Sequence, residues 1–288
     1  MKRITLILAI LMMTPIFILA QTARIQVIHN SADAAASSVG IYLNSALALE
    51  SVNYKTATAF LDLPADAPIT IDIVPTGMGL MSSVYDLTTT LPSGETYIIV
   101  ADGIVSATGY TPAPAFGLEV YAMGREMASD PTNTDVLVHH GSTDAPTVDV
   151  YEQSGLELAD NLMYTDFAGY LELPTDDYVI ELREETGVTT LLAYEAPLSS
   201  LGLDGAAITV FASGFLAPEN NDDGEAFGLY VALSDGTVVP LQAYTPNSIS
   251  NEIISDDSFS IYPNPAVEQV NMSFIARPNN KMTQNSHS

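Results

Sequence analysis

Residues 27–34 read VIHNSADA, and residues 138–146 read VHHGSTDAP. Both stretches contain V-x-H-x-S-x-D-A, and they lie 111 residues apart. Each is followed by an alternating apolar run that ends in a tyrosine, from Val39 to Tyr42 and from Val148 to Tyr151. Later segments also match in the same order, so the sequence predicts two homologous domains in tandem. A period of this length is typical of whole domains and not of a solenoid.

Alternation of apolar and polar residues predicts strands around the repeated stretch. Ile25, Val27 and His29 share one strand face, with Arg24 and Gln26 on the other. Further runs cover residues 57–63, 69–73, 81–91, 97–101 and 116–121. Short strands separated by turns at spacings of about 8–12 residues are typical of sandwiches. We therefore expect an all-β protein with two tandem antiparallel β-sandwich domains of immunoglobulin-like architecture.

Composition shifts give the expected domain boundaries. We expect the first sandwich over residues 21–123 and the second over residues 135–244. A short linker over 124–134, rich in Gly, Asp, Pro and Asn, separates them. A second linker covers residues 245–258, and residues 259–288 form a separate C-terminal segment. Because the first linker is short, the two sandwiches are expected to touch.

Charge and cysteine content exclude several classes of function. The chain has 8 basic and 35 acidic residues, a net charge of −27. Binding to nucleic acid or to an anionic membrane requires clustered basic residues, so neither partner is expected. The acidity indicates solubility outside the cell or, alternatively, divalent-cation binding. With no cysteine, the chain cannot form disulfides or carry a lipid on cysteine.

The N-terminus predicts export. Lys2 and Arg3 precede an uncharged apolar run over residues 4–19, and Ala20 is a small residue at its end. This is typical of a signal peptide over residues 1–20, cleaved after Ala20. An uncleaved membrane anchor is the alternative, because the run is near spanning length. No later segment is long and apolar enough to span, so we expect a secreted or cell-surface protein.

The repeated motif resembles a family of exported bacterial domains described as domain of unknown function 4397. The resemblance covers roughly residues 22–122 and 134–243. The second copy is the closer, with His140, Ser142, Asp144, Ala145 and Pro146 in place, whereas the first has Ala35 where proline is usual. The resemblance implies an extracellular β-sandwich, often in tandem, and no established activity.

The C-terminal segment contains a second motif. Residues 259–267 read FSIYPNPAV, with Tyr262, Pro263, Asn264 and Pro265 at the centre, and apolar residues alternate after it. This resembles the opening of the type A C-terminal sorting domain of type IX secretion, which implies the type IX machinery as a partner. Residues 275–288 lack the alternation, so the resemblance is to a partial domain.

Two sets of polar residues in the repeated motif are candidates for chemistry: His29, Ser31 and Asp33, and His140, Ser142 and Asp144. The favoured interpretation is structural, with Ser and Asp capping backbone groups of the turn and His bonding the same turn. Metal ligation and serine-hydrolase catalysis are the alternatives. A triad brings its members from separate segments, so one strand-to-turn step rarely builds one. We therefore predict no catalytic residues, with an enzyme using His140 and Asp144 as the alternative.

An acidic loop suggests calcium as the one candidate cofactor. Glu219, Asn221 and Asp223 have the every-second-residue spacing of calcium loops, with Gly224 at the turn. Position twelve is Tyr230 and not Glu, so a solvated acidic loop is the favoured interpretation.

Four aromatic residues are expected on outward strand faces: Tyr42, Phe60, Tyr151 and Tyr170. They suggest stacking of sugars or, as the favoured alternative, cross-strand pairing and burial between the domains. The sequence as a whole predicts an exported, non-enzymatic protein used for adhesion or for binding an extracellular protein or glycan. A metal-dependent or hydrolytic enzyme and a calcium-stabilised spacer are the alternatives.

Overall fold

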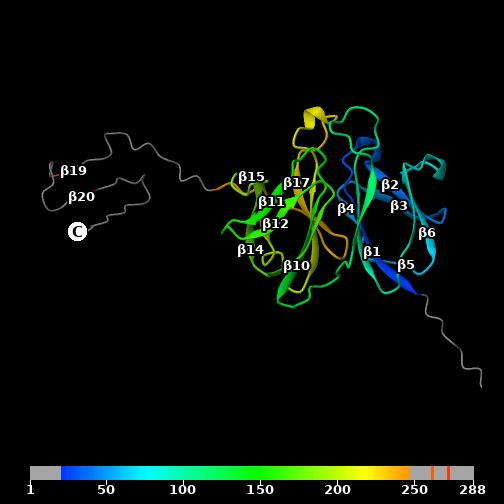
Figure 1. Ribbon diagram of the computed structural model, residues 1–288, viewed down its shortest axis with the longest axis horizontal. Helices are drawn as coiled ribbons and strands as arrows, with labels where there is room; N and C mark the ends of the chain where they lie inside the picture. Colours follow the sequence, from blue (N-terminus) through cyan, green and yellow to red (C-terminus); the bar gives the residue numbers. More distant parts are fainter. Residues whose placement is uncertain (1–20, 247–260, 263–270, 273–288) are drawn as a thin grey trace, which may run out of the picture. The chain divides into compact units, whose positions relative to one another are not determined.

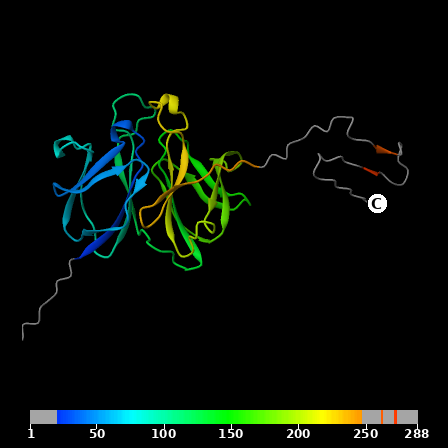
Figure 2. The same ribbon diagram turned by 180° about the vertical axis from the view of Figure 1, so that it is seen from behind.

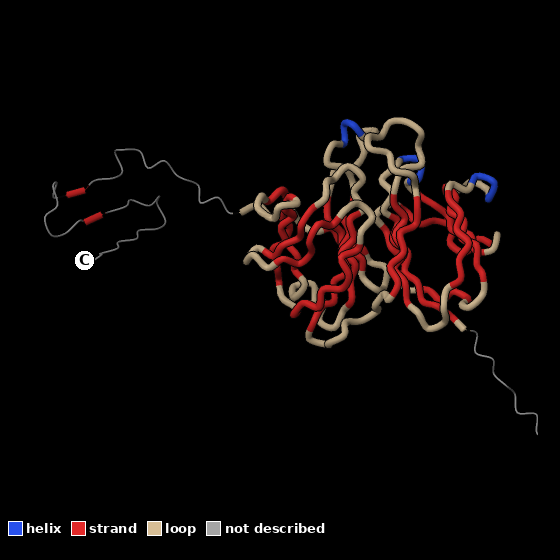
Figure 3. The backbone as a smooth tube through the Cα atoms, viewed as in Figure 1, coloured by secondary structure: helices blue, strands red, loops and turns tan. Residues whose placement is uncertain are grey.

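The computed structural model describes residues 21–246, 261–262 and 271–272, and strands form most of its regular structure (Figure 3). Three short 3-10 helices interrupt the strands: η1 (Ala34–Ala36), η2 (Leu80–Ser82) and η3 (Pro218–Asn220). Two β-sandwiches lie in residues 22–244, which confirms the predicted fold class. We call them the first and the second sandwich.

Two sheets make up the first sandwich. Its inner sheet consists of β4 (Thr56–Ala57) and β5 (Leu61–Pro64) on one side of β1 (Thr22–His29), followed by β8 (Thr96–Asp102) and β9 (Gly117–Ala122). Its outer sheet has the order β3 (Ala46–Asn53), β2 (Ser38–Leu43), β6 (Pro68–Pro75) and β7 (Tyr85–Thr90).

The second sandwich has the same arrangement. Its inner sheet has the order β13 (Phe167–Pro174), β10 (Asn133–His140), β16 (Ala207–Ser213), β17 (Gly228–Ala232) and β18 (Val238–Pro240). Its outer sheet has the order β12 (Glu157–Leu162), β11 (Val148–Glu152), β14 (Asp177–Glu184) and β15 (Thr190–Pro197). Both inner sheets contain one parallel pair, β1 with β8 and β10 with β16, and the other described pairs are antiparallel.

Each sandwich has its own apolar core between its two sheets. The first is built from alternate residues of the strands, including Ile25, Val27, Ile41 and Ile71. These are the residues that the period-two pattern assigns to one face. The second core includes Val136, Val150, Leu182 and Ile208.

The two inner sheets also pack against each other through their outward faces. The buried residues of this junction are Ile28, Phe60, Ile98, Val100, Leu137, Phe211 and Ala232. Figures 1 and 2 show the two sandwiches side by side, with β2, β3 and β6 of one outer sheet and β11, β12 and β14 of the other on the sides away from the junction. Strands of the inner sheets are therefore covered on both faces, which explains why the run Tyr97–Ala101 is apolar without alternation. Residues 22–244 consequently consist of four stacked layers.

Two details of the strand prediction are wrong. Strand β3 was not predicted; it follows β2 through a two-residue turn at Asn44 and Ser45, whose φ values are 49° and 68°. A tight two-residue hairpin turn requires positive φ at both of its central residues. The expected strand over residues 57–63 is broken, because residues 58–60 separate β4 from β5 and Phe60 turns into the junction.

Some expectations fall outside the described residues. These are the signal peptide over residues 1–20, most of the second linker, and Pro263, Asn264 and Pro265 of the sorting motif. Of the C-terminal segment, Ile261–Tyr262 (β19) pairs antiparallel with Asn271–Met272 (β20). Among the described residues, no helix reaches the length and apolarity that crossing a membrane requires.

Candidate functional site

The histidines of the repeated motif hold the loops that follow their own strands. His29 Nε2 lies 2.6 Å from the carbonyl oxygen of Ala36, and His140 Nε2 lies 3.0 Å from that of Pro146. A carbonyl oxygen only accepts, so each Nε2 carries the proton and donates. Burial lowers the pKa of both histidines below the ordinary value, so the neutral imidazole is the favoured form in the folded protein.

The serines of the motif reach a loop far along the chain. Ser31 Oγ donates to the carbonyl oxygen of Gly103 at 2.6 Å, and Ser142 Oγ donates to that of Gly214 at 2.7 Å. Both glycines have positive φ, and a Cβ on either would lie 2.4 Å from a carbonyl oxygen. Glycine is therefore required at this close approach.

The aspartates bind the backbone of the same distant loop. Asp33 Oδ2 accepts the N–H groups of Val105 and Ser106 at 2.7 and 2.5 Å. At the equivalent places, Asp144 accepts the N–H groups of Leu216 and Ala217, each at 2.9 Å. Each motif thus ties the loop after the first strand of its sandwich to a distant loop, which follows β8 in the first sandwich and β16 in the second. We call these two arrangements the loop clamps.

The hydrogen bonds of the first clamp also set the charge of its carboxylate. Burial alone would raise the pKa of Asp33, but the N–H groups of Ser106, Ala35 and Val105 outweigh it and hold the pKa below the ordinary value. Asp33 is therefore ionised at neutral pH. Neither Asp33 nor Asp144 contacts the histidine of its motif by a hydrogen bond in the described part of the chain.

The two loop clamps meet at one end of the molecule. Tyr110 accepts the N–H of Ala34 in the first clamp, and Asn221, the equivalent residue, donates to Asp144 Oδ2 in the second. Asn221 Oδ1 also accepts the N–H of Thr111 from the other sandwich at 2.9 Å. The ring of Tyr110 packs on Phe215 with 5.8 Å between centroids. Figures 1 and 2 show the loops of both sandwiches side by side at this end.

The calcium interpretation of this loop meets a physical obstacle. Asn221 is fully buried and its carboxamide serves Asp144, Ala217 and Thr111, whereas Glu219 and Asp223 are exposed. Asn221 Oδ1 already accepts the N–H of Thr111, so it would have to give up this hydrogen bond to bind a cation. Within the described residues, no group of three His, Asp or Glu side chains is arranged to hold a metal.

A second polar cluster lies in the junction between the sandwiches. His139 Nε2 lies 2.7 Å from Asp102 Oδ2, and the two side chains are 0% and 1% exposed. Asn30 Nδ2 donates to Asp102 Oδ1 at 2.7 Å and to the carbonyl oxygen of Ala212 at 3.0 Å. The ring of His139 also packs on Phe167 at 4.3 Å between centroids. This cluster joins the inner sheets of both halves.

Sequence patterns do not predict this cluster. Asp102 and His139 lie 37 residues apart in different halves, and the equivalent residues are Ser213 and Ile28. Because the pair is not repeated, comparing the halves does not reveal it. One signal was available: His139 adjoins the motif histidine, and a buried strand rarely carries two polar residues in succession without a partner for each.

The few basic residues also gather at the junction. Lys55 binds Glu225 at 2.6 Å and Tyr230 at 2.8 Å across it, and Arg125 of the linker binds Asp135 and Glu172. Arg24 binds Glu126 at 2.7 Å. Of the four basic residues in the described part of the chain, three therefore hold linker or junction carboxylates.

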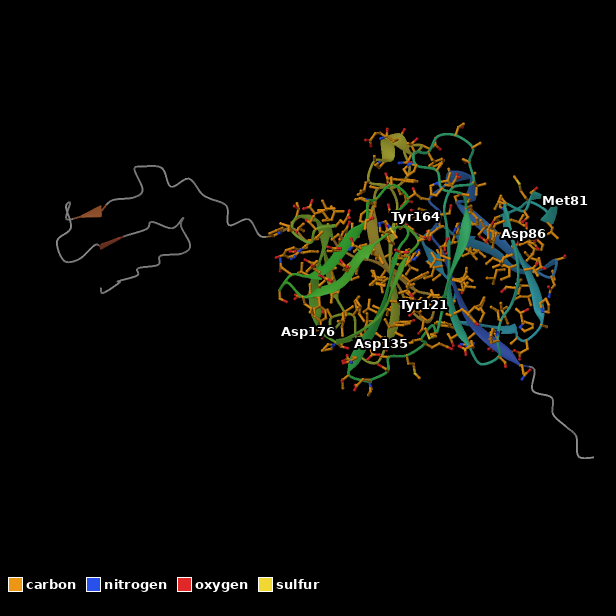
Figure 4. The ribbon with its side chains drawn as sticks, in the orientation of Figure 1. Met81, Asp86, Tyr121, Asp135, Tyr164 and Asp176 are labelled. Carbon is orange, nitrogen blue, oxygen red and sulfur yellow. The ribbon has the colours of Figure 1, made fainter. Side chains whose placement is uncertain are left out.

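The four aromatic candidates divide between two environments. Phe60 and Tyr170 pack in the junction, where burial raises the pKa of Tyr170 to about 12. Tyr121, labelled in Figure 4, packs edge-on against Tyr170 at 5.8 Å between centroids. Tyr42 and Tyr151 lie half-buried on the outer sheets, and Arg183 covers the Tyr151 ring at 4.1 Å. Tyr42, Tyr151 and Tyr170 are all partly exposed, whereas Phe60 is buried.

These observations define an all-β protein of two sandwiches joined through a buried junction. A family model described as "Domain of unknown function (DUF4397)" matches residues 134–223. The match runs from β10 to the loop after η3, and so covers the second loop clamp with Asp144 and Asn221. Comparison with curated proteins gives no match.

Proposed function

We propose that this chain is an exported, non-enzymatic binding protein that acts in secreted form or on the cell surface, with an extracellular protein or glycan as its ligand. The signal-peptide pattern of residues 1–20 and the net charge of −27 support the location. We further infer that the two sandwiches are copies of one domain. Equivalent hydrogen bonds of Ser31 and Ser142, and of Asp33 and Asp144, support the duplication.

One observation carries the binding role: the two loop clamps fasten four loops into one fixed surface. Asn221 joins Asp144 of its own clamp to Thr111 of the other sandwich, and Tyr110 packs on Phe215 between them. Loops held rigidly on a β scaffold are the usual place for recognition. The exposed residues of the surface formed by these loops include Thr108, Pro112, Leu216, Glu219, Asp222 and Asp223. We call this surface the loop face.

The polar residues of the motif favour a structural role over catalysis. His140 donates to Pro146, and Asp144 accepts N–H groups of Leu216 and Ala217, so both are engaged in holding loops. A hydrolase would require Asp144 to orient His140 and His140 to face a nucleophile. Within residues 21–246, no hydrogen bond joins Asp144 to His140.

Binding assays on the loop face test the proposal. A glycan array and a panel of extracellular-matrix proteins are probed with residues 21–246, with the triple variant Glu219→Gln, Asp222→Asn, Asp223→Asn, and with Asp66→Asn from the opposite end as control. We expect a ligand whose binding weakens at least tenfold in the triple variant only. Binding that is unchanged in the triple variant, or turnover of a polymer that His140→Gln abolishes without unfolding the protein, would overturn it.

Export by type IX secretion is the second part of the proposal, and the resemblance around Tyr262 supports it. Fusion of residues 245–288 to a periplasmic reporter in a type IX-competent bacterium tests it. Surface display of the reporter that is lost on Pro263→Ala with Pro265→Ala is the expected result. Retention of the reporter in the periplasm would contradict this part and leave the binding role unaffected.

A further inference from the structure

The first sandwich contains a cavity between its two sheets that the loop face does not involve. Its volume is about 250 Å³, against about 70 Å³ for the corresponding space in the second sandwich. Apolar side chains line it from both sheets, among them Ile41, Leu43, Leu49, Leu61, Ile71 and Leu118. A single charged residue, Asp62, lies at its edge.

The difference in cavity volume between the two sandwiches has a cause in the sequence. In the second sandwich, Tyr178 and Leu241 both line the space and occupy part of it. Ile69 takes the place of Tyr178 in the first sandwich, and no residue corresponds to Leu241, which follows β18 across to the outer sheet. The first sandwich is therefore left with room that its own side chains do not fill.

The cavity opens between two edge strands. Ala48 and Leu49 of β3 line one side and Leu61 and Asp62 of β5 the other, and neither strand has a further partner among the described residues. The lining offers water almost no hydrogen-bond partner, so water is held poorly there. An apolar cavity of about 150 Å³ in another protein binds benzene, so this larger one has room for a larger apolar group.

We propose that the first sandwich binds a medium-length aliphatic chain carrying an uncharged or cationic head group. Stacked sheets lie about 10 Å apart, which leaves a narrow slot between them that suits a linear chain or a flat aromatic probe. The head group would lie beside Asp62, whose nearest cation, Arg24 at 3.4 Å, is held more closely by Glu126 at 2.7 Å. This carboxylate and the net charge of −27 disfavour an anionic head.

Displacement of a neutral fluorescent probe tests the site. Residues 21–246 are titrated with N-phenyl-1-naphthylamine, which is then displaced with decan-1-ol. Leu49→Trp fills the mouth of the cavity, and Leu158→Trp on the edge strand of the second sandwich is the matched control. Leu61→Phe is a second filling variant, and a thermal melt by circular dichroism establishes that each variant is folded.

We expect probe binding in the wild type and in Leu158→Trp, and at least tenfold weaker binding in Leu49→Trp and Leu61→Phe. Binding that persists in both filling variants would place the probe on the surface and overturn the proposal. Absence of probe binding in the wild type would also overturn it. Both results leave the loop-face ligand untouched, so the two proposals fail independently.

Two further measurements identify the head group and show whether the bound aliphatic chain belongs to a membrane lipid or to a free molecule. Decan-1-ol and decylamine should displace the probe at least tenfold more effectively than decanoate. Asp62→Asn should reduce that preference. Equal displacement by all three compounds would contradict the head-group assignment. Phosphatidylcholine vesicles separate the two sources. Co-sedimentation lost in Leu49→Trp assigns the chain to a lipid, and no co-sedimentation with retained decan-1-ol binding assigns it to a free molecule.

Discussion

His139 and Asp102 form a hydrogen-bonded pair between the two sandwiches, with 2.7 Å between Nε2 and Oδ2 and almost no exposure of either side chain. Asn30 adds a second hydrogen bond to the same carboxylate. A buried pair of this kind adds little net stability compared with well-packed apolar residues, but removal of one partner leaves the other unpaired. The pair therefore specifies how the two inner sheets meet.

The first prediction concerns this pair. Asp102→Ala should lower the free energy of unfolding by about 3–5 kcal/mol, because it leaves His139 and Asn30 without their acceptor. The double variant Asp102→Ser with His139→Ile installs the residues of the equivalent positions, Ser213 and Ile28. We expect the double variant to lose less free energy of unfolding than the sum of the losses in the two single variants. Urea unfolding measures all three. Strict additivity would show that the pair is not coupled.

Gly141 faces Asn30 across the junction and gives a second prediction. A Cβ at Gly141 would lie 2.0 Å from Asn30 Nδ2 and 2.8 Å from Asp102 Oδ1. Gly141→Ala should therefore destabilise the protein by about 1–3 kcal/mol through overpacking. Gly79→Ala, where nothing lies within 4 Å of the new Cβ, is the control and should be nearly neutral. Asn30→Ala, when combined with Gly141→Ala, should restore part of the lost stability. An unchanged melting temperature in Gly141→Ala alone would contradict the packing described.

The clamp histidines predict a pH dependence of stability. Burial lowers the pKa of His29 and His140 in the folded state below the ordinary value of 6.5. As pH falls below about 6.5, the unfolded chain therefore takes up protons that the folded chain does not, and stability decreases until the folded pKa is passed. The effect is measured as the difference in melting temperature between pH 7.5 and pH 5.

A comparison with a variant isolates the histidines from the other charges. The net charge of −27 also changes over this range and acts on every variant alike. His29→Gln with His140→Gln keeps a donor at each site and should lose less stability between pH 7.5 and pH 5 than the wild type does. An equal or larger loss in the variant would rule out the histidines as the cause.

Asn221 carries a prediction that separates a structural role from a calcium role. Asn221→Ala removes hydrogen bonds to Asp144, Ala217 and Thr111 and should cost about 1–3 kcal/mol, because buried groups lose their partners. Asn220→Ala, at an exposed neighbour, should be nearly neutral. Addition of calcium or of a chelator should leave the melting temperature of the wild type unchanged. A shift of several degrees with calcium would favour the calcium-stabilised spacer instead.

Sequence patterns predict the fold well where one face of a strand is buried. The alternation of Ile25, Val27 and His29 identifies β1 and its core face, and the same rule finds most of the other strands. The pattern assigns Gln26 to a face away from the core, but does not reveal that this face is buried too. Gln26 donates to Leu233 of the other sandwich at 2.7 Å. Alternation along a strand assigns residues to two faces, but it does not show whether solvent or a second protein layer covers the polar face.

The candidate site is predicted less completely. Local reasoning identifies the motif residues and expects them to bond their own turn, as His29 does with Ala36. It does not find that Asp33 and Ser31 reach a loop more than seventy residues later, around Gly103 and Ser106. Such contacts depend on the parallel pairing of β1 with β8, which brings the ends of both strands to the same edge. Their prediction therefore requires the topology first.

The meeting of Asn30 with Gly141 has a consequence for assembly. If two first sandwiches came together in the same way, two asparagine side chains would compete for the space that one now occupies. Two second sandwiches would leave that space unfilled and would lack the carboxylate that His139 requires. Each sandwich therefore disfavours contact with a second copy of itself, which opposes the association of two chains through like sandwiches.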